Sequence, residues 1–181
     1  MTERVIVFID GSNFYHSVKE EFSIHDNIDF RASGFDSLIK TLTGQRLLAA
    51  VYYYNAPLDR NLNKEVYSKQ QKFFDELRRL PGWNVILCRL RKNETGNYTV
   101  KGDDVHLAVD MVRLTYENVF DTAIIISGDG DFVPAIKVVQ KLGKRVENAY
   151  FNVSASSYLK QVCNSSIPLE SVVKEILENK K

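Results

Sequence analysis

The sequence predicts an α/β fold, a three-layer α/β/α sandwich whose central sheet has five mostly parallel strands. Two observations predict it. Five short runs are rich in β-branched and aromatic residues without polar alternation, which is typical of strands buried on both faces. Between these runs, apolar residues recur every three or four positions, which indicates helices that connect parallel strands and cover both faces of the sheet.

The first half of the chain supplies three of these strands. They are expected over residues 4–9, 47–54 and 83–90. Helical spacing predicts one helix after the first strand and a second that ends at Gly44, with a loop over 23–33 between them. A basic helix is expected over 60–80, because Pro81 and the glycine after it end the helical pattern there.

The second half supplies the other two strands, which are expected over residues 122–127 and 145–151. Residues 91–100 are polar and predict a hairpin or loop. A helix is expected from Lys101 to about Asn118, with an apolar stripe formed by Val105, Ala108, Val109 and Val112. The segment 128–131 turns into a further helix through Leu142, and one or two helices follow the last strand.

Length and composition predict one globular domain, 1–181, with its core in 4–151 and a C-terminal helical extension over 152–181. The chain has 181 residues, of which 44% are hydrophobic and 26% charged. Intrinsic disorder is excluded, and the longest apolar run is far short of the ~20 residues that a membrane span needs. We see no targeting segment, and the two cysteines form no disulfide framework, so a cytoplasmic protein is expected.

Charge is segregated along the chain although the formal net charge is only +1. Residues 60–101 contain ten Lys and Arg against four Asp and Glu, whereas residues 102–131 contain one basic and seven acidic residues. Such segregation fits a protein that binds a polyanion on one part and a cation on another. Two solvated faces are the other interpretation.

Acidic and polar residues follow the ends of two predicted strands and open one predicted helix. In open parallel sheets, ligands bind beyond the carboxyl ends of the strands, at a topological switch point. We therefore expect the three segments to converge at one edge of the sheet. Their residues are Asp10 and Asn13 after the first strand, Asp103 and Asp104 at the start of the helix, and Ser127, Asp129 and Asp131 after the fourth strand.

Each of these groups also has a purely structural interpretation, because Asp, Ser and Asn cap helices and carboxylates are favourable in a first helical turn. Convergence argues against it. Two carboxylates ~4 Å apart repel by ~4 kcal/mol at an effective dielectric constant near 20. The repulsion among four carboxylates in one pocket is larger than any stabilisation from capping, unless the carboxylates are protonated, spread apart or neutralised. Oxygen ligands without cysteine indicate a hard cation, Mg²⁺ or Mn²⁺.

Three motifs resemble those of the NYN domain, a PIN-like nuclease family that includes the bacterial LabA-like proteins. They are Val5–Asn13 (VIVFIDGSN), Lys101–Asp110 (KGDDVHLAVD) and Ile125–Phe132 (IISGDGDF), in the expected order and spacing. The resemblance covers roughly residues 4–151. It implies a Rossmann-like fold and metal-dependent cleavage of RNA.

The resemblance also implies roles for individual residues. Asp10, Asp104, Asp129 and Asp131 match the family's metal-binding and catalytic aspartates, with Asn13 and Ser127 in support. Asp103 falls at a variable position of the middle motif and makes the choice of ligand there less certain. Asp110 lies on the helix face of Asp103 and not on that of Asp104, so it ranks below Asp104 as a ligand.

The predicted function is a metal-dependent ribonuclease, an endoribonuclease that uses Mg²⁺ or Mn²⁺. The metal lowers the pKa of a bound water, which attacks the phosphorus in line and leaves a 5′-phosphate and a 3′-hydroxyl. One alternative is a non-catalytic RNA- or nucleotide-binding regulatory module that keeps the acidic pocket. A phosphohydrolase of small phosphate esters is a weaker alternative, because Gly11 and Ser12 follow Asp10 where an Asp-x-Asp pair is expected.

Basic side chains near the acidic helix are the candidates for RNA contact. They are Arg89, Arg91, Lys92 and Lys101, which are expected to contact the phosphates of single-stranded RNA. Three consecutive tyrosines could also stack on RNA bases: Tyr52, Tyr53 and Tyr54. Because they lie in a strand that is predicted to be buried, most of them are expected in the core. A homo-oligomer or a protein partner is compatible with the sequence, and no membrane association is expected.

Overall fold

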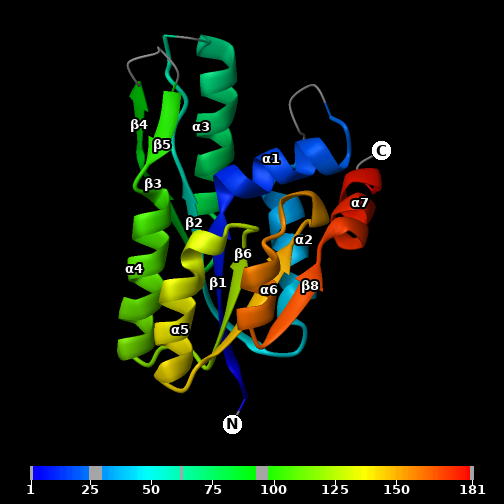
Figure 1. The fold of residues 1–181 in the computed structure, drawn as a ribbon. Helices are drawn as coiled ribbons and strands as arrows, with labels where there is room; N and C mark the ends of the chain where they lie inside the picture. Colours follow the sequence, from blue (N-terminus) through cyan, green and yellow to red (C-terminus); the bar gives the residue numbers. More distant parts are fainter. Residues whose placement is uncertain (1, 25–29, 62, 93–97, 180–181) are drawn as a thin grey trace.

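The computed structural model describes residues 2–24, 30–61, 63–92 and 98–179, and for 90–92 and 98–101 only the backbone. Its centre is a six-stranded sheet in which all strands are parallel (Figure 1). The strand order is β3-β2-β1-β6-β7-β8. The strands are β1 (Arg4–Asp10), β2 (Leu47–Asn55), β3 (Trp83–Leu87), β6 (Thr122–Ile126), β7 (Arg145–Tyr150) and β8 (Ser165–Pro168).

Helices cover both faces of this sheet, which confirms the predicted three-layer α/β/α sandwich. One face packs against α1 (Gly11–Glu21), α2 (Ala32–Thr43), α3 (Lys64–Arg78) and α7 (Glu170–Glu178). The other face packs against α4 (Asp103–Tyr116), α5 (Val133–Lys141) and α6 (Ser157–Val162). Two short 3-10 helices, η1 (Gly130–Phe132) and η2 (Asn152–Ser154), follow β6 and β7.

The central strand β1 shows why the sequence forms this sheet. Val5, Val7 and Ile9 point into the core on the α1–α2 side, and Ile6 and Phe8 point into the core on the α4–α5 side. Because successive side chains of a strand alternate between faces, a strand covered on both sides needs apolar residues at every position. Truncating one such fully buried side chain, as in Phe8→Ala, costs about 3–5 kcal/mol.

The prediction of five strands was wrong by one. The sixth strand, β8, pairs in parallel with β7 at the edge of the sheet and lies inside the segment 152–181 that was expected to be helical. β8 has only four residues, none of them fully buried, so it carries no continuous apolar run. Pro168 ends it at an edge position, where a missing N–H is tolerated.

The apolar stripe predicted for α4 was wrong at Val105 and Val109, although Ala108 packs partly buried against the core. Val105 and Val109 are 65% and 57% exposed, whereas Leu107, Met111 and Leu114 are buried against the sheet. Both sets of residues recur at helical spacing. Periodicity alone therefore does not show which set is packed against the core.

The region between β3 and α4 forms the predicted polar hairpin. β3 ends at Leu87, three residues before the predicted end of that strand. The chain then forms a separate antiparallel ribbon from β4 (Arg89–Lys92) and β5 (Tyr98–Lys101), with Arg89 opposite Lys101. The connection between these two strands, 93–97, lies outside the described residues. The ribbon leads directly into α4 and so sets where that helix begins.

The order of the strands identifies the edge at which a ligand is expected. From β1 the chain moves outward through β2 and β3 on one side, then returns to β6, which pairs with the other side of β1. The switch point of the sheet is therefore between β1 and β6, where the chain leaves each strand at the same edge. Of the helices that the structure describes, none has the length and apolar character needed to cross a bilayer.

Candidate metal-dependent active site

Asp10 is the innermost carboxylate at the switch point. It ends β1 and caps α1, so its Oδ1 accepts a hydrogen bond from the backbone N of Asn13 at 2.9 Å. Its Oδ2 accepts one from Ser127 Oγ at 3.1 Å. Asp10 is only 6% exposed, and this burial raises its pKa to about 6, although both hydrogen bonds oppose the shift. The charges of Asp104 and Asp103 raise it further.

Ser127 and Asn13 join the ends of β1 and β6. Ser127 Oγ, which donates to Asp10, also accepts from the backbone N of Asp129 at 3.1 Å. Asn13 Oδ1 accepts from the backbone N of Gly128 at 3.0 Å. The two predicted supporting residues therefore hold two of the predicted aspartates in a fixed relation to each other.

Asp129 and Asp131 lie at the entrance to α5. Asp129 caps η1, and its Oδ1 accepts from the backbone N of Asp131 at 2.9 Å. Asp129 is half-buried and Asp131 is exposed, so their carboxylates border solvent on the outer side of Asp10. Capping of η1 explains the carboxylate of Asp129. It does not explain that of Asp131, which lies inside η1.

The first turn of α4 brings the third acidic segment to the same place. Asp103 is buried and Asp104 is more exposed. Partial burial of the Asp104 carboxyl raises its pKa, and the charges of Asp103, Asp129 and Asp131 raise it further. Segments about 90 and 25 residues apart in the chain thus come to one edge of the sheet, as predicted.

Asp110 has a different environment from the other aspartates. Its Oδ2 accepts a hydrogen bond from Tyr54 Oη at 2.9 Å, and its Oδ1 pairs with Arg113 at 3.0 Å. One of these partners is the cation Arg113, and among the described side chains the other aspartates at this edge form no ion pair with a lysine or arginine. Burial raises the pKa of Tyr54, and the charge of Asp110 raises it further. Asp110 anchors α4 to β2.

The side chains at this edge offer oxygen donors only, the type of ligand that a hard divalent cation prefers. Within the side chains described here, none of Asp10, Asp104, Asp129 and Asp131 forms an ion pair with a lysine or arginine. Among the described residues, no three His, Cys, Asp or Glu side chains are grouped so that they could together hold a metal ion. Mg²⁺ needs no such group, because it keeps several waters and binds through one or two carboxylates.

Several residues that the sequence analysis missed hold this edge together. Asn148 Nδ2, fully buried in β7, donates to the Ser127 carbonyl oxygen at 2.8 Å. Ser17 Oγ on α1 hydrogen-bonds with Ser154 Oγ at 2.7 Å. A Cβ on Gly128 would lie 2.1 Å from the Ser154 carbonyl oxygen, so the close approach of η2 requires glycine there. Asn148 could have been identified from the sequence, because it is a polar residue within a buried strand. Nothing in the sequence around Ser154 indicated its role.

The predicted RNA-contacting residues are only partly visible. Arg89 is exposed at the start of β4. The side chains of Arg91, Lys92 and Lys101 lie outside the described part of the structure. By its backbone position, Lys101 ends β5 two residues before Asp103, so the basic ribbon and the acidic helix adjoin.

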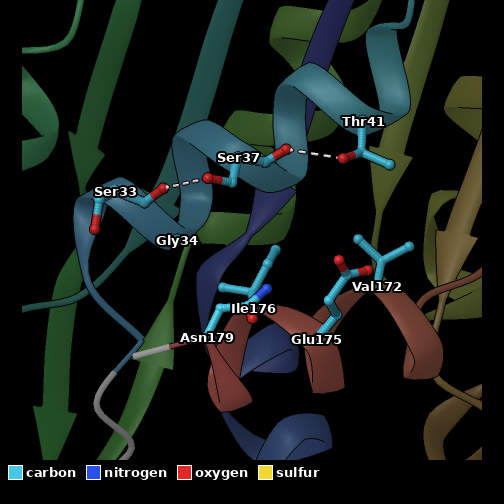
Figure 2. Close-up of a pocket in the computed structure, with 8 residues that line it drawn as sticks. All are labelled: Ser33, Gly34, Ser37, Thr41, Val172, Glu175, Ile176 and Asn179. Atoms are coloured by element: carbon cyan, nitrogen blue, oxygen red, sulfur yellow. Dashed lines mark hydrogen bonds between the residues drawn. The ribbon is translucent and has the colours of Figure 1, made fainter. Parts of the chain in front are cut away.

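A separate hollow of about 400 Å³ lies between α2 and α7, away from these aspartates (Figure 2). In Figure 2 the hydroxyls of Ser37 and Thr41 are bonded to carbonyl oxygens one turn back in their own helix, at 3.0 and 3.1 Å. Glu175 is its one carboxylate. This hollow has no chemistry comparable to that of the carboxylate edge.

The fold and the carboxylate edge define a Rossmann-like α/β domain of the nuclease type. The NYN domain family matches residues 4–170, and the chain belongs to this family, a PIN-like nuclease superfamily domain. Comparison with curated proteins finds no match. The chain is similar in structure to a protein of unknown function from Vibrio parahaemolyticus, with a TM-score of 0.68 and 18% identity, over 94% of this chain and 95% of that one. That likeness supports the fold.

Proposed function

We propose that this protein is a metal-dependent ribonuclease that hydrolyses phosphodiester bonds in single-stranded RNA. One observation carries the proposal. Four carboxylates from three segments lie at the switch point of the sheet, and among the described side chains none of them forms an ion pair with a lysine or arginine. Membership of a nuclease family gives the class of reaction. The carboxylates are Asp10, Asp104, Asp129 and Asp131.

The chain's own residues orient this site. A bound divalent ion supplies positive charge for the phosphate and activates water for attack. Asp10 is held on both oxygens, by Asn13 N and Ser127 Oγ, so it cannot rotate freely. Ser127 fixes Asp129 through the same hydroxyl. Asp131 lies further out, where a phosphate approaches from solvent.

The finer parts of the proposal come from the sequence motifs. The ion is Mg²⁺ or Mn²⁺, the products carry a 5′-phosphate and a 3′-hydroxyl, and the enzyme acts in the cytoplasm. Placement in the LabA-like branch is part of the same proposal. Homo-oligomerisation or a protein partner is left to experiment.

The test is cleavage of end-labelled single-stranded RNA by the purified protein in Mn²⁺, in Mg²⁺ and in EDTA. Asp10→Asn and Asp129→Asn are the test variants. Asp121→Asn is a matched control, because Asp121 is an aspartate at the opposite edge of the same sheet, paired with Arg4. We expect cleavage that needs the metal, is lost in both test variants and is kept in the control.

Two results would contradict the proposal. Equal cleavage by the wild type and both test variants would mean that the activity does not come from the carboxylate edge. Metal-dependent RNA binding without cleavage by any of the proteins would favour the regulatory-module alternative.

A further inference from the structure

A groove of about 660 Å³ begins at the outer side of the carboxylate edge. It is lined by Gly130, Asp131, Val133, Pro134, Lys137 and Tyr158. Asp131 is thus both a member of the proposed catalytic set and a wall of the groove. The other walls come from the first turns of α5 and from α6, which Figure 1 shows side by side.

Tyr158 presents an aromatic ring to this groove. The residue is 51% exposed, unlike Tyr53 and Tyr54, which are buried in β2 and cannot stack on a ligand. Lys137 Nζ donates to Tyr158 Oη at 2.7 Å and lies 5.2 Å from the ring centroid. The ammonium therefore lies beyond the phenol oxygen, at the edge of the ring, and does not cover either face.

Lys137 gives the groove a positive charge next to the carboxylates. An ammonium has three donors, and the bond to Tyr158 uses one. The remaining two are available to a phosphate oxygen. Because the neighbouring carboxylates repel the RNA backbone, a lysine in the groove that Asp131 also lines offsets the repulsion on the strand that leaves the site.

We propose that this groove binds the nucleotide adjacent to the scissile phosphodiester, with its base stacked on the Tyr158 ring and its phosphate on the Lys137 ammonium. This inference rests on the ribonuclease function proposed above. Every base has a π-face, so stacking on tyrosine holds single-stranded RNA without selecting a sequence. Pro134 and Val133 add apolar surface beside the ring. Double-stranded RNA is disfavoured, because its bases are already stacked and paired.

The experiment measures binding separately from cleavage. Short single-stranded RNAs carry one 2-aminopurine, moved along the strand, and are titrated with protein in Ca²⁺. The fluorescence of 2-aminopurine falls when it stacks, and anisotropy of an end label gives the affinity. Test variants are Tyr158→Ala, Tyr158→Phe and Lys137→Ala. Tyr116→Ala is the matched control, because Tyr116 is 70% exposed but lies at the far end of α4.

We expect Tyr158→Ala to weaken RNA binding about tenfold and to abolish the quench at one position of the strand. Tyr158→Phe keeps the quench, because it removes only the bond to Lys137. Lys137→Ala weakens binding and flattens its salt dependence while keeping the quench. An RNA that lacks the base at the quenched position binds the wild type and Tyr158→Ala equally well. If the protein also cleaves RNA, Tyr158→Ala raises KM more than it lowers kcat.

Some outcomes would overturn the subsite and others the nuclease. Wild-type binding by Tyr158→Ala, a loss of binding that persists with the base-free RNA, or no RNA binding at all would contradict the groove. If the quench depends on Tyr158 but no protein cleaves RNA, the groove stands and the nuclease proposal fails. Thermal melting of each variant shows whether it is folded.

Discussion

The two edges of the central sheet handle their carboxylates in opposite ways. At the edge where the strands begin, Asp121 accepts hydrogen bonds from Arg4 N, Nε and Nη2 at 2.9, 3.1 and 2.8 Å. Lys144 Nζ lies 3.8 Å from the same carboxylate, and Arg46 pairs with Glu147 at 3.0 Å. Arg4 holds the pKa of Asp121 well below its usual range.

At the edge where the strands end, the pKa values move the other way. Burial raises the pKa of Asp10 to about 6, and the pKa of Asp104 is raised by burial and by neighbouring carboxylates. The carboxylates Asp121 and Glu147 at one edge are paired with lysine or arginine, whereas those at the other edge form no such ion pair among the described side chains. Carboxylates that are not paired within a protein are typical of sites that a ligand completes at a cost in stability, as the proposed function requires.

The largest expected difference between the two edges is in activity. Asp10→Asn should lower RNA cleavage at least about a hundredfold, because a displaced or missing ligand spoils the geometry of attack. Asp121→Asn should leave cleavage within about twofold, because its carboxylate contacts only the opposite edge. Initial rates in Mn²⁺ measure both. A similar loss in the two variants would mean that the carboxylate edge is not the active site.

The same two substitutions should change stability in opposite directions when no divalent ion is present. The folded pKa of Asp10, about 6, lies above the ordinary aspartate pKa of 3.8. The folded protein therefore holds the proton more tightly, and its free energy of unfolding falls by up to about 3 kcal/mol as pH rises from about 4 to 6. Above that window Asp10→Asn should raise the melting temperature by several degrees.

Asp121→Asn should lower the melting temperature. Because the pKa of Asp121 is held down, its contribution is present at neutral pH and is lost as pH falls below its ordinary range. Its side chain is 41% exposed, so the change should be smaller than that at Asp10. Melting curves in EDTA from about pH 4 to 8 test both signs. If Asp121→Asn stabilised the protein or Asp10→Asn destabilised it, the proposed difference between the two edges would be contradicted.

Metal addition should affect only the edge where the strands end. Mg²⁺ or Mn²⁺ at 100 times its dissociation constant should stabilise the wild type by about 2.7 kcal/mol. The increase should be smaller at about pH 5, because protons compete with the cation for Asp10. Asp10→Asn should lose the increase and Asp121→Asn should keep it. An unchanged wild-type melting temperature in millimolar Mn²⁺ would count against the metal site.

The carboxylate edge was predictable because its residues adjoin strands that are buried on both faces. Asp10 directly ends β1 and Ser127 directly follows β6, so recognising two apolar runs was enough to place them together. β8 was missed for the converse reason. It is the outermost strand of the sheet, beside β7 only, so its residues need not be apolar. The wrong stripe on α4, with Val105 exposed, shows that periodicity predicts a helix but not which side is buried.

What the sequence did not indicate is how the edge is held. Ser154 is 137 residues from Ser17 in the chain. Its hydroxyl contacts Ser17 and its carbonyl oxygen lies against Gly128, and no local sequence pattern predicts either contact. Tyr158 and Lys137 meet in the same way, from α6 and α5. Contacts of this kind depend on how the segment after β7 folds back across Gly128, which is a tertiary property.

The smallest expected effect concerns this support. Ser17 is buried, and its hydroxyl lies 2.7 Å from Ser154 Oγ and 3.4 Å from Asn13 Oδ1. Ser17→Ala should lower the free energy of unfolding by about 1 kcal/mol, because it removes a buried hydrogen bond and leaves Ser154 without that partner. Ser37→Ala is the matched control, since that hydroxyl is on an exposed helix face and, among the described residues, donates to the Ser33 carbonyl oxygen alone.

The control should be neutral or slightly stabilising, because alanine is the better helix former. Urea unfolding of both variants gives the comparison, and the slope of the transition shows whether it stays cooperative. If Ser17→Ala also lowers RNA cleavage several-fold while Ser37→Ala does not, the contact between α1 and η2 orients Asn13 and the aspartates beyond it. Equal stability of the two variants would mean that the packing of η2 on Gly128 holds the edge without this hydroxyl.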